Sequence, residues 1–209
     1  MIVGLFGVPR VGKNTIATMI AQRELKKIKM GITHFEHVYT DFYCEGCEQI
    51  SWKDFGNYKI KNSVIIFEEM GVDADARDYK KFEQRKRDAL VLHGHFFNDV
   101  YYCTQNYSNV DKKIRDLTTE LWYLEKSCVP FLCEFTVAKR VFRTIAINEL
   151  TSELVMGYRF ATPLEKIFTK CTMICFRPFY YKYFDSYDEG SLADLPEYNG
   201  LLWGEPLPV

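Results

Sequence analysis

The stretch GVPRVGKNT, from Gly7 to Thr15, constrains the fold more than any other part of this 209-residue chain. An apolar run, Ile2 to Phe6, precedes it, and apolar residues at nearly helical spacing follow it as far as Met30. Glycines allow a loop to wrap its backbone N–H groups around phosphate, and a lysine after the second glycine reaches the terminal phosphates. The stretch therefore predicts a strand, a phosphate-binding loop and a helix, with a nucleotide as the ligand.

The predicted loop supplies the candidate nucleotide contacts. Asn14 stands where a serine or threonine hydroxyl usually binds magnesium in such loops. An amide oxygen can bind a hard cation, but it is neutral and differs in geometry from a hydroxyl. Thr15 cannot simply replace that hydroxyl, because one residue is about 100° around a helix. Nucleotide binding is thus better supported than fast hydrolysis, and the predicted contacts are Gly7, Val8, Pro9, Arg10, Val11, Gly12, Lys13, Asn14 and Thr15.

A second strand of the chain is predicted to end in two carboxylates. The run SVIIFEEMG, Ser63 to Gly71, has the continuous apolar character of a strand that is buried on both faces, as in a parallel sheet. Enzymes that transfer phosphate use one carboxylate to hold the water shell of magnesium and often a second to polarise the attacking water. We therefore predict that Glu68, together with Asn14, coordinates Mg²⁺, and that Glu69 is the general base.

Two further polar residues lie at the end of the next predicted strand, Asn98 to Gln105, and beyond it. Gln105 stands at its end, where a side chain could sense the terminal phosphate or orient water. Arg115, in VDKKIRDL, is a candidate arginine finger directed towards a neighbouring subunit. By spacing alone, however, a solvated basic face is the better interpretation of Arg115. These two residues complete the predicted catalytic set of Glu69, Gln105 and Arg115.

The remaining pattern changes from helical to alternating along the chain. His37 to Phe42 and Thr118 to Lys126 read as strands, and Arg77 to His93 as an amphipathic helix with the residues EQRKRD on its polar side. From Phe131 to about Arg159 the period is two, with Phe131, Cys133, Phe135 and Val137 on one face. We expect an α/β fold with a mainly parallel central sheet and a C-terminal antiparallel β extension.

The predicted boundaries follow this change of period. Residues 1–128 form the nucleotide-binding α/β core, residues 129–187 the β-rich extension of the same domain, and residues 188–209 an irregular tail. No internal repeat or low-complexity linker divides the chain.

Charge and aromatic content limit which parts of the chain could contact nucleic acid. The 27 basic and 28 acidic residues give a formal net charge of −1, which excludes a strongly basic overall field. Contact with DNA would need a local basic face. The candidates are Arg85 to Arg87, and the run FRPFYYKYF with Arg177 and Lys182, whose aromatic rings could stack on single-stranded bases. A solvated helix face and core packing are the respective alternatives.

The cysteines indicate the compartment. Seven cysteines, an odd number, predict reduced thiols in the cytosol rather than a disulfide framework. Cys44 and Cys47 form a lone C-x-x-C, which we interpret as a loop because zinc normally needs four ligands. No apolar run approaches the roughly 20 residues needed to span a bilayer, so a transmembrane segment is not expected.

Taken together, the motifs GVPRVGKNT, VIIFEEMGVDADAR and DVYYCTQNYSNVDKKIRDL resemble the zonular occludens toxin family, whose ATPase domain is shared with filamentous-phage assembly proteins. The resemblance covers roughly Met1 to Tyr187. It implies a P-loop NTPase fold of the additional-strand, RecA-like class, related to motor ATPases that pump DNA. The matching residues are Lys13 for the phosphate lysine, Glu68 and Glu69 for the acidic pair, Gln105 for the sensor, and Arg77 and Arg115 for two arginines.

The resemblance also implies a function. It implies an ATP hydrolase that uses ATP and Mg²⁺, acts as a homo-oligomeric ring, and assembles or extrudes phage carrying single-stranded DNA. Its partners would be that DNA and phage or membrane assembly proteins, in the cytoplasm of a bacterial host and at the inner face of its membrane. Phage members of the family often continue into a membrane helix, whereas this chain ends at Val209 without one.

Two departures from the family pattern keep other functions open. Asn14 replaces the hydroxyl and Glu68 the usual aspartate, so the rate of hydrolysis is the open question. One alternative is a nucleotide-gated binding or scaffold protein with little hydrolysis. A small-molecule kinase is a weaker alternative, because no arginine-rich lid is evident.

Overall fold

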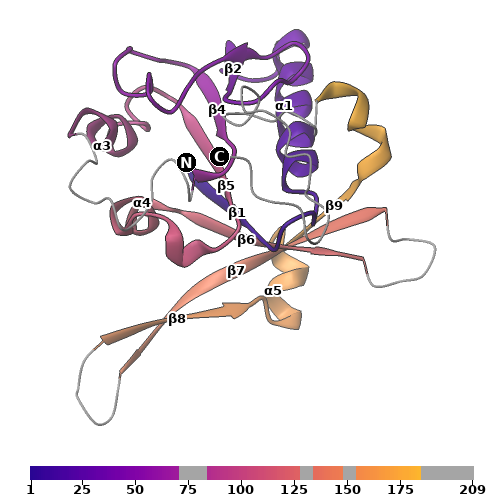
Figure 1. Cartoon of the computed structure of the whole chain (residues 1–209). Coiled ribbons are helices and arrows are strands. Elements are labelled where there is room, and N and C mark those ends of the chain that lie inside the picture. Colours follow the sequence, from indigo (N-terminus) through magenta and orange to yellow (C-terminus); the bar gives the residue numbers. More distant parts are fainter. Residues whose placement is uncertain (71–83, 128–133, 148–153, 185–209) are drawn as a thin grey trace, which may run out of the picture.

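The fold is built on one mixed sheet, and the computed structural model describes residues 1–70, 84–127, 134–147 and 154–184. Figure 1 shows the sheet running through the molecule, with helices beside it. Within the described residues its strands are β1 (Ile2–Phe6), β2 (His37–Thr40), β3 (Glu48–Gln49), β4 (Ser63–Phe67), β5 (Asp99–Thr104), β6 (Glu120–Lys126), β7 (Phe135–Ile147), β8 (Leu154–Phe160) and β9 (Thr172–Phe176).

The strand order places the predicted site elements side by side. It reads β3-β2-β4-β5-β1-β6-β7-β8, with β9 also paired to β7. Every pair from β3 to β6 is parallel, and β7 pairs antiparallel with β6, β8 and β9. The predicted mainly parallel sheet with a C-terminal antiparallel extension is therefore confirmed. β5 lies between the loop strand β1 and the acidic strand β4, which is the additional strand of the predicted class.

Helices cover both faces of the parallel part of the sheet (Figure 1). α1 (Lys13–Lys29) packs on one face, and α3 (Gln84–Val91) and α4 (Lys112–Leu117) pack on the other. Successive residues of a strand point to opposite faces, so each central strand contributes to two cores. The first core includes Ile16, Ile20, Val64 and Ile66, and the second includes Leu90, Ile114, Ile65 and Phe67.

β4 shows why the apolar run SVIIF becomes a central strand. All five of its residues are buried, as the sequence predicted for a strand covered on both faces. Burying one such aliphatic side chain stabilises the fold by about 1.5–3 kcal/mol. Its β-branched residues also favour the pleated conformation.

The end of α1 agrees with the sequence. Gly31 has a positive φ of 66°, a conformation that glycine adopts without steric strain, and its N–H donates to the carbonyl oxygen of Ile28 at 2.9 Å. Lys26, Lys27 and Lys29 lie in the last turn, where they complement the negative end of the helix dipole.

The helix predicted over Arg77 to His93 is only partly as expected. α3 begins at Gln84 within the described residues, while residues 77–83, Arg77 included, lie outside them. The sequence placed EQRKRD on the polar side of this helix, and this is wrong for Lys86. Lys86 is buried, and its ammonium lies 5.5 Å from the centre of the Trp52 ring, because the loop carrying Trp52 packs under the helix. The basic cluster Arg85 to Arg87 therefore does not form one continuous exposed patch, because its middle residue is buried.

The buried face of β7 also differs from expectation. The sequence grouped Phe131, Cys133, Phe135 and Val137 on one face, and the first two lie outside the described residues. Phe135 and Val137 are only half-buried, whereas Thr136 and Ala138 on the opposite face have no exposed surface. The reason is the neighbouring phosphate loop, because the Thr136 hydroxyl donates to the Val11 carbonyl oxygen at 2.7 Å.

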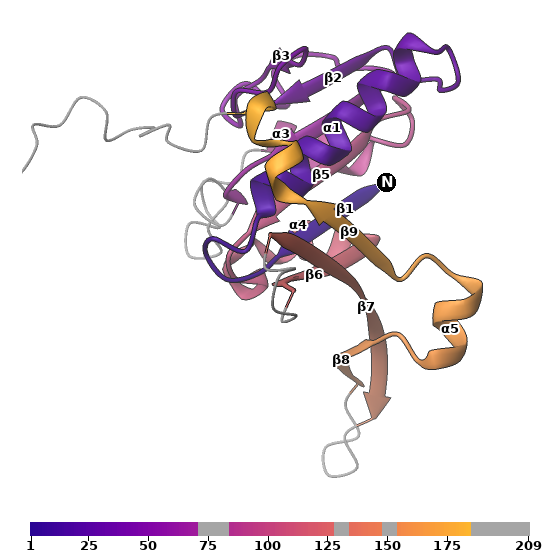
Figure 2. The same cartoon turned by 90° about the vertical axis from the view of Figure 1, so that its right-hand side faces the viewer.

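Beyond this contact, β7 and β8 run out from the α/β core, as Figures 1 and 2 show.

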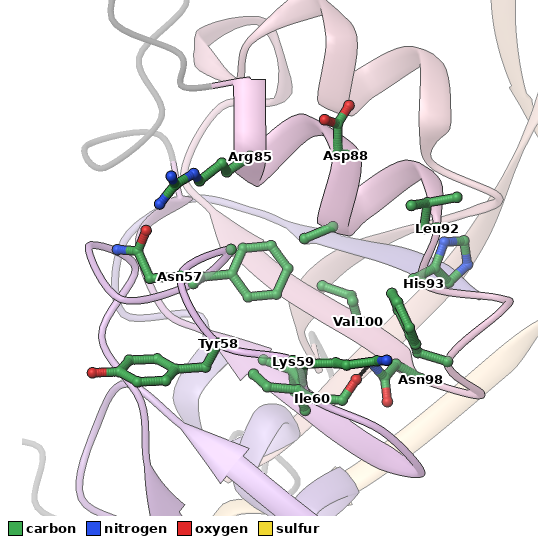
Figure 3. Close-up of a pocket in the computed structure, with 15 residues that line it drawn as sticks. Asn57, Tyr58, Lys59, Ile60, Arg85, Asp88, Leu92, His93, Asn98 and Val100 are labelled. Carbon is green, nitrogen blue, oxygen red and sulfur yellow. Dashed lines mark hydrogen bonds between the residues drawn. The ribbon is translucent and has the colours of Figure 1, made fainter.

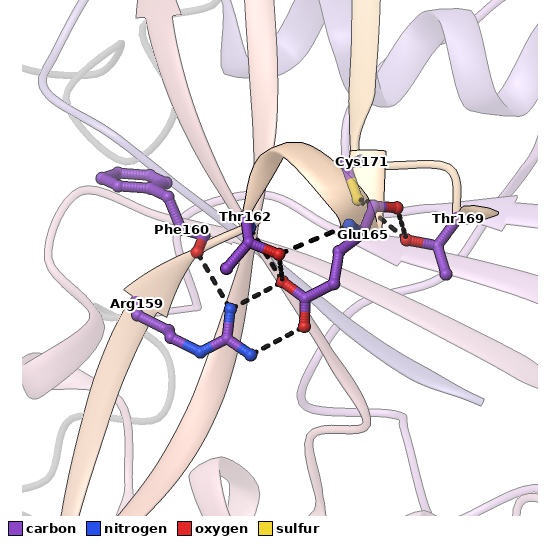
Figure 4. Close-up of polar contacts among 6 residues, drawn as sticks. All are labelled: Arg159, Phe160, Thr162, Glu165, Thr169 and Cys171. Atoms are coloured by element: carbon purple, nitrogen blue, oxygen red, sulfur yellow. Dashed lines mark hydrogen bonds and ion pairs between the residues drawn. The ribbon is translucent and has the colours of Figure 1, made fainter. Parts of the chain in front are cut away.

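The short helix α5 (Pro163–Phe168) joins β8 to β9 and is fixed by a capping box (Figure 4). Glu165 accepts from the backbone N–H of Thr162 and from both terminal nitrogens of Arg159, at 2.8, 2.7 and 2.6 Å. These contacts, Arg159 foremost, lower the pKa of Glu165 to about 2.

Thr136→Val tests the contact between the antiparallel extension and the loop. Valine keeps the shape but removes the hydroxyl, leaving a buried Val11 carbonyl without this donor. We expect the free energy of unfolding in urea to fall by about 1–3 kcal/mol. Thr172→Val, on the exposed side of β9, is the control and should stay within about 0.5 kcal/mol of the parent. Equal stability of Thr136→Val and the parent would show that the hydrogen bond from Thr136 to Val11 does not stabilise the fold.

Candidate functional site

The predicted phosphate-binding loop joins β1 to α1, and its backbone conformation depends on glycine. Gly12 has a φ of 97°, which L side chains rarely adopt. A Cβ on Gly12 would lie 2.4 Å from the Thr136 hydroxyl oxygen, and a Cβ on Gly7 would lie 2.7 Å from the Leu124 carbonyl oxygen. Both glycines therefore allow the loop to lie directly against the β6–β7 part of the sheet.

Lys13 is the first residue of α1 and lies over the loop. Its side chain is buried, and its ammonium donates to the carbonyl oxygens of Gly7 at 3.0 Å and Val8 at 3.3 Å. No side chain caps the start of the 17-residue helix, so the first-turn N–H groups are not bonded to a cap. A buried cation beside the positive end of a helix dipole favours an anion, and above all phosphate.

The acidic pair lies opposite the start of α1. The Asn14 side-chain amide donates a hydrogen bond to the Glu68 carboxylate, so these two predicted metal ligands are in direct contact. Asp41, which follows β2, accepts from the Glu68 backbone N–H through both carboxylate oxygens, at 2.8 and 2.9 Å. Sequence reasoning missed Asp41 because it was included inside the predicted strand. Its signal was an aspartate at the carboxyl end of a strand that neighbours the acidic one.

The predicted base and sensor are also in contact. The Gln105 side-chain amide donates to the Glu69 carboxylate at 3.2 Å, although the two residues follow different strands. Glu69 has a positive φ of 50°, which is unusual for a residue with a side chain. The turn after β4 thus directs Glu69 towards the end of β5, where both side chains remain accessible to solvent.

A buried thiol reports the charge around these groups. Cys103 lies on β5 and has no exposed surface. Burial raises the pKa of the Cys103 thiol well above its ordinary value, and the nearby carboxylates of Glu68 and Asp41 raise it further. The Cys103 thiol is therefore kept protonated beneath these carboxylates and does not act as a nucleophile.

The phosphate-binding loop, the acidic pair and Gln105 share one cleft of about 900 Å³. Six of the nine predicted loop contacts line it, whereas Gly7, Val8 and Val11 do not and shape the loop instead. Three residues from the C-terminal part of the chain, which sequence reasoning did not assign to the site, complete its wall. The lining residues are Pro9, Arg10, Gly12, Lys13, Asn14, Thr15, Glu68, Glu69, Gln105, Arg177, Tyr181 and Phe184.

The donor set of the cleft fits magnesium in one particular way. Within the residues that the structure describes, no three His, Cys, Asp or Glu side chains are grouped to hold a metal ion. Magnesium usually keeps several waters and takes one or two carboxylates together with phosphate oxygens of the substrate. Glu68 provides one such carboxylate to the cleft, and the Asn14 amide lies in contact with it.

Arg115 is not among the residues that line the cleft of its own chain. It lies on α4, with its guanidinium carbon 6.0 Å from the centre of the Tyr107 ring. Its carbonyl oxygen accepts from Arg143 and, at 3.2 Å, from the Tyr107 hydroxyl. The structure therefore separates Arg115 from Glu69 and Gln105.

A second cavity, of about 300 Å³, lies between the segment after Phe55 and helix α3 (Figure 3). Asn98 is the polar residue of its lining that is buried, and its side chain is already engaged. It donates to the Ile60 carbonyl oxygen at 2.8 Å and accepts from the Ser63 N–H at 3.0 Å. This cavity carries no phosphate-binding loop, so the chemistry lies in the larger cleft.

The C-x-x-C is a turn, as interpreted from the sequence. Cys44 is buried, and a hydrogen bond from Cys47 lowers the pKa of its thiol. Gln22 donates to the Cys44 sulfur at 3.6 Å.

No helix in the described part of the chain is both long and apolar enough to cross a bilayer.

Comparison with known proteins places the fold. No protein-family model matches the chain, and no curated protein is similar to it in sequence. The N-terminal domain of zonular occludens toxin from Neisseria meningitidis superposes with a TM-score of 0.51 at 14% identity, over 88% of this chain and 98% of that domain.

Two further solved structures are more distant. The genome-packaging NTPase B204 of Sulfolobus turreted icosahedral virus 2 has a TM-score of 0.44 at 9% identity, over 74% of this chain and 95% of its own. The flagellar accessory protein FlaH of Methanocaldococcus jannaschii has a TM-score of 0.41 at 14% identity, over 66% and 76%. The chain has a P-loop NTPase fold of the kind found in the zonular occludens toxin domain.

Proposed function

We propose that the chain binds a nucleoside triphosphate, ATP, with Mg²⁺ and hydrolyses it. The observation that carries the proposal is the composition of one cleft. A glycine loop at a helix start, with Lys13, faces the carboxylates of Glu68 and Glu69 and the amide of Gln105 across it. Cations and backbone N–H groups on one side and water-directing groups on the other are what phosphoryl transfer to water requires.

Each side chain has a proposed role. The loop N–H groups and Lys13 bind the phosphates, and Glu69, aligned by Gln105, orients the attacking water and takes up its proton. Asn14 and Glu68 hold the water shell of magnesium, and Asp41 fixes the backbone of Glu68. Magnesium, when bound, would neutralise charge on the phosphate oxygens.

We further propose that the ATPase works as a ring that assembles or extrudes phage DNA at the inner face of a bacterial membrane. The motif resemblance and the shared fold support this proposal. Arg115 lies outside its own cleft, as a finger that acts on a neighbour's nucleotide must. On α5, Leu164, Ile167 and Phe168 are each at least two-thirds exposed, which suits a contact between subunits.

A nucleotide-gated scaffold is the second candidate. The hydrogen bond from Asn14 to Glu68 favours it, because this bond occupies the carboxylate that would otherwise face the metal. In this case ATP binds and changes the protein without being cut. The two candidates differ in phosphate release from the bound nucleotide, and not in its affinity.

Lys13→Ala tests nucleotide binding. Removing the buried cation should weaken ATP affinity at least a hundredfold, since hydrogen bonds from a charged group to phosphate are strong. Lys29→Ala removes an exposed lysine at the other end of the same helix and should leave affinity unchanged. Calorimetric titration with Mg-ATP makes the measurement. Equal affinities for the two variants would refute the assigned ligand of the loop.

Glu69→Gln tests the proposed base. The amide keeps the size of the side chain but cannot accept a proton, so turnover should fall about 10²–10⁴-fold. Binding of ATP should remain. Glu45→Gln, at an exposed position outside the cleft, is the matched control for steady-state phosphate release. Wild-type turnover in Glu69→Gln would assign the base to another residue.

Arg115→Ala tests the action of one subunit on the next. The variant should bind ATP normally and lose turnover about 10³-fold, as expected for an arginine finger. Parent turnover per chain should rise with protein concentration as the oligomer forms. Lys112→Ala, exposed on the same helix, serves as control. The same turnover per chain in dilute monomer and in oligomer rules out the finger.

A further inference from the structure

Arg177 is brought to the nucleotide cleft from the far end of the domain. It begins a short 3₁₀ turn, η3 (Arg177–Phe179), directly after β9. The β7–β9 pairing aligns Phe176 with Phe135, and the Arg177 N–H donates to the Glu134 carbonyl oxygen at 3.0 Å. The antiparallel extension, and not the P-loop core, therefore determines where this arginine lies.

The side chain of Arg177 lies against the phosphate-binding loop. It is 14% exposed and lines the same cleft as Lys13 and Asn14. A Cβ on Gly12 would be only 3.0 Å from the Arg177 Cδ, so the aliphatic part packs on the loop backbone. The guanidinium is thereby held at the wall of the cleft, beside the helix start where phosphate is proposed to bind.

One partner of this guanidinium is a carboxylate that is itself half-exposed. The carboxylate of Glu134 lies 3.2 Å from a terminal nitrogen of Arg177, and the Glu134 side chain is 48% exposed. The Tyr181 hydroxyl, from the next turn η4 (Tyr181–Tyr183), donates to the same carboxylate at 3.4 Å. Half-exposed ion pairs are weak, whereas a guanidinium can bind phosphate through two parallel hydrogen bonds.

We infer that Arg177 is a phosphate-binding residue supplied by the same chain, and that Glu134 competes with the nucleotide for it. The inference rests on the proposed function and adds a residue to it. Arg177 acts on the nucleotide of its own chain, in contrast to the role proposed for Arg115. When phosphate replaces Glu134, nucleotide binding is coupled directly to the C-terminal turns that carry Tyr181.

Titration with Mg-ATP of three single variants and one double variant tests the inference. Arg177→Met retains the aliphatic packing on Gly12 and should weaken binding about 10–100-fold, the loss of a hydrogen bond to a charged group. Arg177→Lys should recover part of that loss. Glu134→Gln, at a half-exposed position that need not disturb folding, should tighten binding about two- to fivefold.

The double variant distinguishes competition between Glu134 and ATP for Arg177 from a general repulsion of ATP by the charge of Glu134. Glu134→Gln should have no effect on affinity in the Arg177→Met background, because its effect acts through the guanidinium. Thermal unfolding of each variant establishes that it is folded. Unchanged affinity in Glu134→Gln, or the same tightening with and without Arg177, overturns the inference.

The same titrations distinguish this inference from the proposed function. If the parent does not bind ATP, the proposed function fails. If the parent binds, Lys13→Ala does not, and a folded Arg177→Met binds as the parent does, the proposed function stands and only the role of Arg177 is lost.

Discussion

The parallel pairing of β4, β5 and β1 is the constraint on which the site depends. Backbone hydrogen bonds align Phe67 with Tyr102 and Phe6 with Thr104, so the three strands end at the same edge of the sheet. Because the strands are buried on both faces, a shift of the pairing register by one residue would move every side chain of a strand from one core to the other. The loop after β1, the carboxylates after β4 and the glutamine after β5 therefore face one another without further adjustment.

The antiparallel extension forms part of the site wall. Thr136 of β7 holds the loop by a hydrogen bond, and the lack of a side chain at Gly12 allows β7 and Arg177 to approach it closely. The loop is thus enclosed between α1, the parallel sheet and the C-terminal segment. Direct contacts therefore connect the cleft with β7, which runs out of the core with β8.

The sequence predicted the features that are encoded locally. The loop with Lys13, the acidic end of β4 and the strand before Gln105 each lie within one short segment whose periodicity and residue types identify it. The contacts that it did not predict join distant segments. Arg177 meets Gly12 only because β9 pairs with β7, and Asp41 meets Glu68 only because β2 pairs with β4. Likewise, burial of Thr136 and Lys86 depends on neighbouring segments, the loop and the Trp52 segment, that periodicity does not reveal.

We propose that Asn14 limits the rate of hydrolysis and leaves nucleotide binding intact. The most direct test of the central claim is titration of the purified chain with ATP in the presence and absence of Mg²⁺, followed by phosphate release from the bound complex. We expect saturable binding that magnesium strengthens and slow, continuing release of phosphate. Failure to bind ATP under either condition would contradict the assignment of the cleft, and binding without any release would leave the scaffold in place of the enzyme.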